Sequence, residues 1–375
     1  MKNGILGACP EVLSWQESTL LHSSLLISHR DFLRTRFERA LAAFVKAGVG
    51  DRLARLSDAL PTHALDRLIT APDSAWRLVY GREKDLLFFV ESVQAEHYRT
   101  GGAGSIRRGV WTALGDHYYP AGYLKPDNPL HYSSLAWNDE SYFRAPCLTN
   151  GIVVDYTSSH AERFLRLAKL PLGSIQPLAL SKIIRKLEGA RALVELVSEH
   201  AYELISSHTQ SILVWNDTSR NSEHFSLSNP RWPGRIGFSN VEYDHTDTVA
   251  LADSMIHESI HAFFHRIEEV SPFLNPDGAD LGVTVSSPWT GRILHIHSFL
   301  HACYVWFALW QFWLRASSCR TSAPGDRIQQ MIDRSRIGFF SPSMDYALTA
   351  TRPYLSTEGQ SVFAFVRDVQ GGVYD

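Results

Sequence analysis

Through much of the first hundred residues, apolar side chains recur at the spacing of a helix, with polar side chains between them. In the segment Asp31–Lys46 the apolar side chains recur every three or four residues: Phe32, Leu33, Phe37, Leu41 and Phe44. This spacing predicts an amphipathic helix, and Asp85–Val93 has a similar pattern. After a flexible break at Gly101–Gly104, the stretch from Arg107 to Pro171 is rich in Tyr, Pro, Gly and Asn, which predicts mainly irregular structure.

The period changes in the second half of the chain. Two short runs predict buried strands, Ser211–Trp215 and Gly234–Phe238, and Gly151–Tyr156 predicts a short strand within the irregular stretch before them. Apolar residues at helical spacing predict further helices: Leu178–Ser206, Val249–Glu269, Ile293–Trp313, Arg327–Ile337, Met344–Thr351 and Thr357–Val369. The predicted fold is therefore mainly α (α+β), a helical, bundle-like protein with a small sheet beside a metal-site helix.

Composition limits the class of protein. Charged residues make up 20% of the chain, hydrophobic residues make up 45%, and the net charge is −3, so we expect neither a nucleic acid nor a membrane as partner. The run Phe299–Leu314 is interrupted by His301 and Gln311 and predicts a buried core helix rather than a membrane span. Scattered cysteines indicate reduced thiols, and the few apolar residues before Cys9 do not make a signal peptide. We therefore expect a cytoplasmic protein.

The pattern that carries chemistry is the segment His257–His261, which reads HESIH. Two histidines four residues apart lie about one helical turn apart on one face, so both imidazoles can reach a single ion. Glu258 stands beside them, where it could act on a metal-bound water or orient a ligand. The alternative is that both histidines are capped or core residues without a metal. His265 continues the series but is turned further round the helix, so we expect it beside the site rather than as a ligand.

A third ligand must come from another part of the chain. Histidines cluster in the next predicted helix, and His301 is the first choice because it lies in the most apolar part of that helix. His297, one turn earlier, is the reserve, and convergence of both with the motif would make a dinuclear site. A carboxylate from Glu268 or Glu269 is the other alternative. No Glu occurs between Glu269 and Glu358, so the chain lacks the Glu on a later helix that is the third ligand in one class of zinc peptidase.

Two reactions suit such a site. Zinc would polarise a carbonyl while Glu258 takes a proton from the bound water, which is hydrolysis. Iron held by two histidines and one further ligand keeps three open positions, enough for a bidentate 2-oxo acid and dioxygen. The distal carboxylate of that cosubstrate needs a fixed cation, for which Arg292 is a candidate and Arg235 a weaker one. The alternative for Arg292 is an ordinary surface position.

From about Ser226 to Trp313 the chain resembles the HExxH-type 2-oxoglutarate-dependent peptide β-hydroxylases, which act on ribosomally made peptides. In that family a proline–tryptophan pair precedes an arginine, and a leucine–histidine pair then opens an aromatic-rich helix. Four segments around the motif carry the resemblance: Gly234–Phe238 (GRIGF), Leu251–Ile256 (LADSMI), Ser287–Trp289 (SPW) and Leu300–Trp306 (LHACYVW).

The resemblance implies that Fe(II) is held by His257, His261 and His301, with 2-oxoglutarate and O2 as cosubstrates bound near Trp289 and Arg292. It implies hydroxylation of a side-chain β-carbon in a precursor peptide. On this interpretation residues 1–205 form a mostly helical region that recognises the peptide, and residues 206–375 form the catalytic region. The motif alone is also compatible with a zinc metallopeptidase, or with a peptide-binding scaffold that has a vestigial site.

Overall fold

The computed structural model describes residues 9–15, 19–81, 85–101, 109–118, 142–171, 173, 175–269, 271–275 and 282–373. The structure is 62% helical, with 14 α-helices and small sheets among the described residues, which confirms the predicted mainly α (α+β) fold class. Among the residues described, none of the helices combines the length and the apolar character that a membrane span requires.

Contacts between residues divide the chain into two compact units, and each unit is assembled from separated stretches. The first comprises Met1–Leu25, Gly189–Ser207 and Thr248–Asp375. The second comprises Leu26–Glu188 and His208–Asp247. The predicted division after residue 205 lies close to one of the points where the chain passes between the units. The peptide-recognition role given to residues 1–205 stays a prediction.

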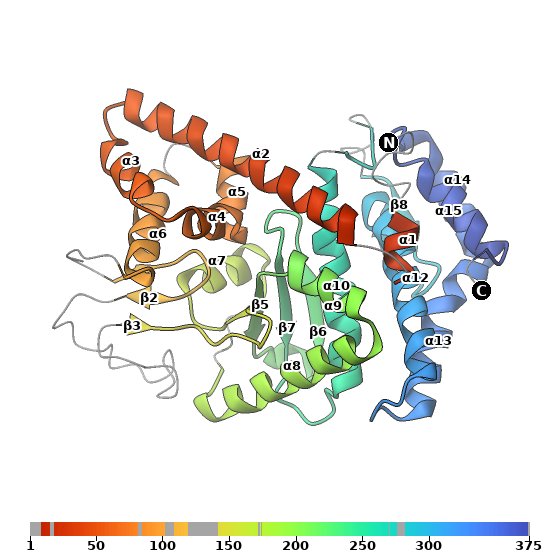
Figure 1. The fold of residues 1–375 in the computed structure, drawn as a ribbon. Helices are drawn as coiled ribbons and strands as arrows, with labels where there is room; N and C mark the ends of the chain where they lie inside the picture. The colour runs from red at the N-terminus through yellow and green to blue at the C-terminus, as the bar shows by residue number, and fades with distance from the viewer. Residues whose placement is uncertain are drawn as a thin grey trace. The chain divides into compact units, whose positions relative to one another are not determined.

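A group of helices coloured red to orange in Figure 1 makes up one part of the second unit. Their bounds are α2 (Thr19–Lys46, which begins in the first unit), α3 (Asp51–Asp58), α4 (Thr62–Thr70), α5 (Pro72–Tyr80) and α6 (Leu86–Arg99). Their apolar side chains share one core, in which the ring of Phe37 in α2 meets the ring of Phe89 in α6. Both helices predicted from the sequence in this region are confirmed as parts of α2 and α6.

Two small sheets belong to the same unit. One is antiparallel, with the strand order β1 (Val110–Trp111), β2 (His117–Tyr118), β3 (Tyr142–Phe143). The other has the order β4 (Val153–Asp155), β5 (Ser211–Trp215), β7 (Arg235–Ser239), β6 (Phe225–Ser228), with the first three parallel and β6 antiparallel to β7. Between these strands in the sequence lie α7 (Ser159–Leu167), α8 (Pro177–Val197, which ends in the first unit) and the turn η3 (Thr218–Arg220).

The three parallel strands are buried along their whole length. Strands covered on both faces have continuous apolar sequences instead of an alternating pattern, which explains the short runs in the sequence. The register pairs Ile212 of β5 with Ile236 of β7 and Val214 with Phe238, so large apolar side chains are neighbours across the sheet. The strands predicted from these runs are confirmed.

A buried ion pair lies at the start of β7. Arg235 Nη1 is 2.6 Å from Oδ2 of Asp73 in α5, and both side chains are fully buried. Asp155 Oδ2 lies 3.8 Å from the same guanidinium, whose Nε–H donates a hydrogen bond to Ser211 Oγ at 3.2 Å. Burial alone would raise the pKa of Asp73, but Arg235 and neighbouring positive groups outweigh burial and lower it. Arg235 is therefore held by carboxylates of its own unit.

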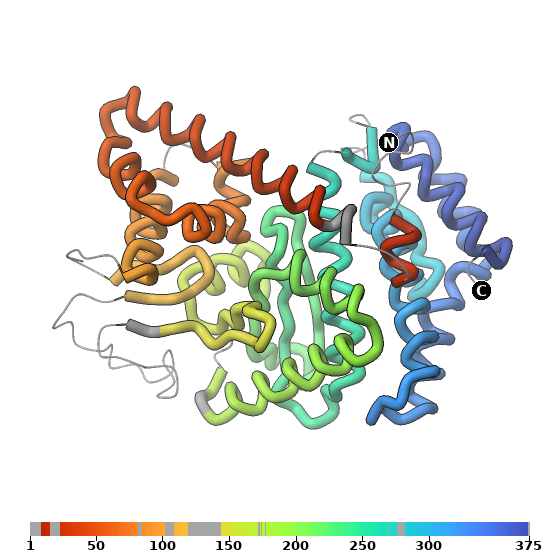
Figure 2. Tube along the Cα trace, viewed as in Figure 1, coloured from red at the N-terminus to blue at the C-terminus, as the bar shows by residue number. Residues whose placement is uncertain are grey.

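The first unit contains the HExxH helix. Its elements are α1 (Cys9–Leu13), α9 (Glu199–His208), α10 (Thr248–Glu268), β8 (Thr284–Ser286), β9 (Ile293–His295), α12 (Ile296–Ser318), α13 (Gly325–Arg336), η4 (Ile337–Phe340), α14 (Pro342–Thr351), η5 (Arg352–Tyr354) and α15 (Ser361–Gln370). The red α1 lies against the blue α12 in Figure 2. The Nε1–H of Trp15, just after α1, donates to the Ala308 carbonyl oxygen at 2.8 Å. Most of α12 is buried, so the apolar run beginning at Phe299 is a core helix, as predicted.

The predicted helix Leu178–Ser206 is wrong in one respect, because it is interrupted at Ser198. α8 ends at Val197 and α9 begins at Glu199. The Ser198 hydroxyl accepts a hydrogen bond from the Ala201 N–H at 3.2 Å, which is how a serine before a helix satisfies an N–H group of its first turn. The cap explains why apolar periodicity continues across the break while the helix does not.

The predicted start of the next long helix at Ile293 is also wrong. Residues Ile293–His295 form β9, which pairs antiparallel with Thr284–Ser286 of β8. α12 therefore begins at Ile296, and His295 caps it, since its Nδ1 accepts a hydrogen bond from the His297 N–H at 3.3 Å. A two-stranded hairpin thus leads directly into the helix that carries the predicted third ligand.

The buried pair at β7 yields a stability prediction. Arg235→Met leaves the Asp73 carboxylate without its closest counter-charge, so we expect the free energy of unfolding to fall by about 3–5 kcal/mol. The measurement is urea denaturation at neutral pH. The matched control is Glu162→Gln, which removes an exposed ion pair with Arg166 and should cost less than about 1 kcal/mol. Equal, small effects of both substitutions would contradict a structural role for Arg235.

Candidate metal centre

The HExxH motif lies on α10, which packs against α12. His257, His261 and His265 follow one another at intervals of four residues, so they form a stripe that turns by about 40° at each step. α12 carries His297 and His301 on the side that meets this stripe and the end of α10. One helix–helix contact therefore gathers the histidines of two distant sequence segments.

Two ring pairs among the predicted ligands lie at the distance of imidazoles that share an ion, although the ligand atoms of His257, His261 and His301 do not all lie within 4.8 Å of one another. The ring centroids of His257 and His261 are 5.0 Å apart, and those of His261 and His301 are 5.3 Å apart. Two imidazoles bonded to one ion at about 2.1 Å, with about 90–110° between the bonds, have centroids about 4.6–5.3 Å apart. The Nδ1 atoms of His261 and His301 are 3.1 Å apart. We call these three histidines, which are the predicted ligands, the upper set.

Glu268, at the end of α10, fixes the orientation of His301. Its Oε2 atom lies 2.8 Å from His301 Nε2 and 2.6 Å from His297 Nε2. An ionised carboxylate only accepts hydrogen bonds, so both Nε2 atoms carry a proton. In neutral His301 the lone pair is then on Nδ1, the atom that faces His261. A carboxylate that sets the tautomer of a metal-binding histidine in this way is a common feature of metal sites.

Burial keeps the imidazoles uncharged, which is the form that binds a metal. It lowers the pKa of the 1% exposed His301 and of His261, and it lowers that of His257 to about 4, with the charge of Arg334 adding to the last shift. Burial alone would raise the pKa of Glu268, but the two imidazoles that it bonds hold this pKa below its usual range. At neutral pH the site therefore combines neutral imidazoles with an ionised carboxylate.

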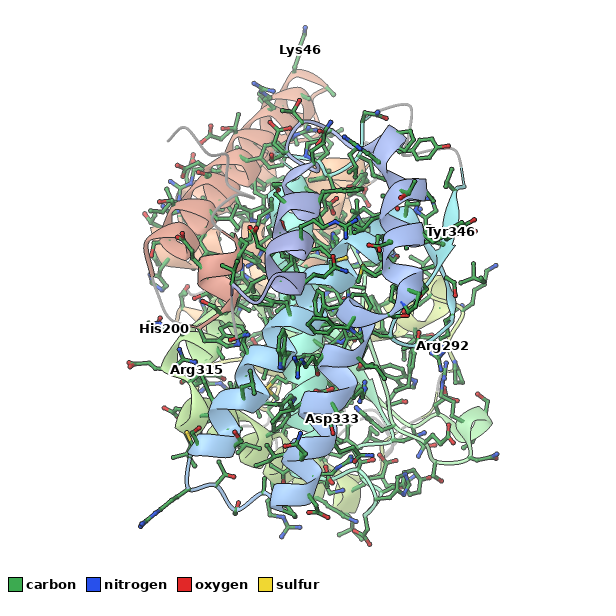
Figure 3. The ribbon with its side chains drawn as sticks, turned by 90° about the vertical axis from the view of Figure 1, so that its right-hand side faces the viewer. Lys46, His200, Arg292, Arg315, Asp333 and Tyr346 are labelled. Carbon is green, nitrogen blue, oxygen red and sulfur yellow. The ribbon has the colours of Figure 1, made fainter. Side chains whose placement is uncertain are left out.

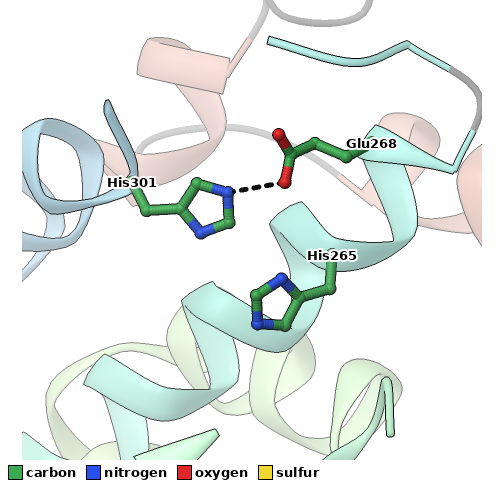
Figure 4. A group of neighbouring side chains, drawn as sticks. All are labelled: His265, Glu268 and His301. Atoms are coloured by element: carbon green, nitrogen blue, oxygen red, sulfur yellow. Dashed lines mark hydrogen bonds and ion pairs between the residues drawn. The ribbon is translucent and has the colours of Figure 1, made fainter. Parts of the chain in front are cut away.

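A second group of donors lies one turn further along α10. The ligand atoms of His265, Glu268 and His301 all lie within 4.8 Å of one another, and Figure 4 shows them facing one another from the two helices. His265 is 8% exposed, and its buried Nδ1 has no hydrogen-bond partner among the described residues. An unpaired buried nitrogen is the kind of atom that an ion or water would satisfy. We call this group the lower set, and His257 lies outside it.

The two sets differ in the role of Glu268. In the lower set it binds the ion directly and completes a two-histidine, one-carboxylate site. In the upper set it stays outside the ligands and orients His301. The Oε2 atom of Glu268 already accepts hydrogen bonds from His297 and His301, and an ion on that atom would displace them. The hydrogen bonds on Oε2 and the motif spacing favour the upper set, whereas the mutual distances of the donor atoms favour the lower set.

Glu258 and Trp289, two further predicted site residues, differ in how they lie with respect to the motif helix. Glu258 is 4% exposed, so its side chain lies on the covered side of α10. Trp289 stacks on Trp306 with ring centroids 5.9 Å apart, and Trp306 is also 5.9 Å from the His257 ring, which it meets edge to face. The SPW segment is therefore brought to the motif helix through one intervening indole.

The predicted arginines lie in contrasting places. Arg292 is exposed in the turn between β8 and β9 (Figure 3), and its side chain makes no ion pair with a described residue. Arg235 is paired with Asp73 in the second unit. Sequence reasoning missed Arg334 of α13, whose guanidinium carbon lies 4.9 Å from the Trp306 ring centre and whose Nη1 lies 3.8 Å from Asp253 Oδ2. The sequence feature that could have pointed to an arginine here is Asp253, an acidic residue one helical turn before His257 on the same stripe.

Comparisons with known proteins give no family for this chain. No model of a protein family matches it. No curated protein is similar to it in sequence. The candidate centre rests on the motif, on the packing of α10 against α12, and on the hydrogen bonds of Glu268.

Two substitutions distinguish the upper set from the lower set. If the upper set binds the ion, His257→Ala removes a ligand and should weaken Co²⁺ binding by more than the roughly 10–100-fold that losing an outer partner costs. His265→Ala should leave Co²⁺ affinity nearly unchanged. The measurement is a titration of metal-free protein with Co²⁺, followed by visible absorption.

Glu268→Gln serves as a third variant in the same titration. It keeps the shape of the side chain but removes the charge that orients His301, so we expect Co²⁺ affinity to fall roughly 10–100-fold. The exposed Glu358 provides the control variant Glu358→Gln. The reverse ranking, with His265→Ala severe and His257→Ala harmless, would place the ion in the lower set.

Proposed function

We propose that this protein is a non-haem iron, 2-oxoglutarate-dependent oxygenase that hydroxylates the β-carbon of a residue in a ribosomally made peptide. The observation that carries the proposal is the approach of His301 to the second motif histidine, with Nδ1 atoms 3.1 Å apart. His257, whose ring centroid lies 5.0 Å from that of His261, would complete a set of neutral nitrogen ligands on one side of an ion. The remaining positions suit a bidentate 2-oxo acid and dioxygen.

The residues of the upper set would hold a ferrous ion, which would supply the activation of dioxygen that this chemistry needs. Glu268 accepts a hydrogen bond from the Nε2–H of His301, and this keeps the Nδ1 lone pair of His301 directed toward His261. The rings of Phe264 and Phe273, each centred 5.3 Å from the His301 ring, cover that imidazole and keep water from competing for its nitrogens. Each of these side chains acts on the direction or the protonation of a ligand atom.

The proposed reaction balances without a further reductant. The C–H bond of the peptide supplies two electrons, and oxidative decarboxylation of 2-oxoglutarate to succinate and CO2 supplies two more, which together reduce one O2. One oxygen atom enters the new hydroxyl group and the other enters succinate. No water is activated as a nucleophile. Glu258, 4% exposed, is therefore assigned a positioning role in this proposal rather than the role of a general base.

The substrate and the compartment are part of the same proposal. The resemblance of residues 226–313 to peptide β-hydroxylases supports a precursor peptide as substrate, with residues 1–205 as the region that recognises it. All four cysteines are free thiols, which supports a reducing compartment such as the cytoplasm. Trp289 remains the aromatic residue proposed to lie near the bound cosubstrate, because it stacks on Trp306, whose ring contacts that of His257.

Anaerobic titration of the Fe²⁺-loaded protein with 2-oxoglutarate tests the proposal. We expect a saturable visible charge-transfer band, because the 2-oxo acid chelates the metal that the histidines hold. The band should be absent in His257→Ala and His301→Ala. Glu258→Gln should keep the band and a part of the hydroxylation activity, since that carboxylate is not a ligand in this proposal.

Two other results would overturn the oxygenase proposal. A zinc-loaded protein that cleaves peptides, forms no band with any 2-oxo acid and loses all cleavage in Glu258→Gln would be a metallopeptidase. A protein that retains no metal after anaerobic reconstitution with Fe²⁺ or Zn²⁺ would be a binding scaffold with a vestigial site.

A further inference from the structure

A 2-oxo dicarboxylic acid presents a second carboxylate that needs a fixed cation near the metal site. Neither arginine chosen from the sequence has surroundings that suit this use. Arg235 is fully buried against Asp73. Arg292 is an exposed turn residue whose backbone N–H, not its guanidinium, is engaged, with Thr290 Oγ1 at 3.4 Å. The cation must therefore be sought among the side chains that border the motif.

Arg334 borders the motif through a shared indole. Its guanidinium carbon lies 4.9 Å from the centre of the Trp306 ring, and the same ring meets His257 at 5.9 Å. The turn of α13 that carries it is marked by Asp333 in Figure 3.

The backbone beside Arg334 is anchored by the SPW segment. Trp289 donates its Nε1–H to the Ser335 carbonyl oxygen at 2.9 Å and stacks on Trp306. Gly338 lies so close to the Trp289 ring that a Cβ atom there would be 2.4 Å from it. The indole of Trp289 therefore fixes the end of α13 against α12, and with it the position from which Arg334 extends.

The guanidinium is held in place but keeps free donors. Asp253 Oδ2 is 3.8 Å from its Nη1, which is an ion-pair distance and too long for a hydrogen bond, and the Arg334 side chain is 53% exposed. Asp253 is itself engaged by Trp313, whose Nε1–H donates to Oδ1 at 2.9 Å. A guanidinium has five N–H donors in a planar fork that fits a carboxylate. Arg334 can therefore take a carboxylate from solvent without giving up a hydrogen bond to any described residue.

We propose that Arg334, stacked on Trp306 beside His257, binds the distal carboxylate of the 2-oxo dicarboxylic acid. This inference rests on the proposed function and assigns to one residue the selection of a five-carbon dicarboxylic acid over a monocarboxylic 2-oxo acid. Trp289 is then a positioning residue, which acts through α13. The SPW segment would then affect cosubstrate binding by positioning Arg334, without itself contacting the cosubstrate.

The test compares 2-oxoglutarate with 2-oxobutyrate, which chelates a metal in the same way but lacks the distal carboxylate. In Fe²⁺-loaded protein under anaerobic conditions, Arg334→Gln should weaken 2-oxoglutarate binding by roughly 10–100-fold, the loss expected for one charge-assisted contact. The affinity for 2-oxobutyrate should not change, and Arg334→Lys should restore part of the loss. The matched control is Arg336→Gln, since Arg336 stacks in the same manner on Trp310 and Phe340.

The inference is overturned if Arg334→Gln binds 2-oxoglutarate as well as the unsubstituted protein does, or if both 2-oxo acids lose affinity equally. A failure of the proposed function looks different, because no 2-oxo acid then produces a band in the unsubstituted protein. In that case calorimetry of glutarate binding to metal-free protein decides. Binding that disappears in Arg334→Gln supports the carboxylate site, and absent or unchanged binding overturns it.

Discussion

The hydrogen bond between Glu268 and His301 is the interaction on which the candidate centre depends. Glu268 ends α10 and His301 lies one turn into α12, so the 2.8 Å contact joins the two helices where their histidines meet. It also decides chemistry, because a carboxylate acceptor forces the proton of neutral His301 onto Nε2 and leaves Nδ1 for His261. One pair of atoms thus joins the two helices and sets the tautomer of a predicted ligand.

The cost of this arrangement is the burial of several imidazoles around one anion. A buried imidazole loses less on leaving water when its nitrogens have partners, and Glu268 accepts a hydrogen bond from Nε2 of both His297 and His301. His265 Nδ1 is left unpaired among the described residues. This nitrogen belongs to the lower set, and a protein without use for an ion beside it would gain stability by replacing it with an apolar side chain. The polar cluster in an otherwise aromatic surrounding therefore favours a functional role over a purely structural one.

Local periodicity predicts most helices and the parallel strands, because apolar spacing reports directly on burial. It fails at Ile293–His295, where pairing with a strand nine residues earlier, not local preference, decides the conformation. The motif spacing predicts His257 and His261, and the apolar surroundings of His301 mark it as buried. The role of Glu268 is not readable in the sequence, since its contacts with His297 and His301 arise only when α10 and α12 pack. Arg334 is hidden for the same reason.

The aromatic residues explain why an arginine so distant in sequence can serve the motif. A guanidinium over an indole gains cation–π attraction without losing its in-plane N–H donors, so Trp306 can hold Arg334 while leaving its fork open. Trp289 is stacked on the same ring and bonded to the backbone at Ser335, so it limits how far α13 can move from α12. The SPW segment therefore connects to the candidate metal centre through α13, and a change at Trp289 would alter the position of the Arg334 charge rather than that of a predicted ligand.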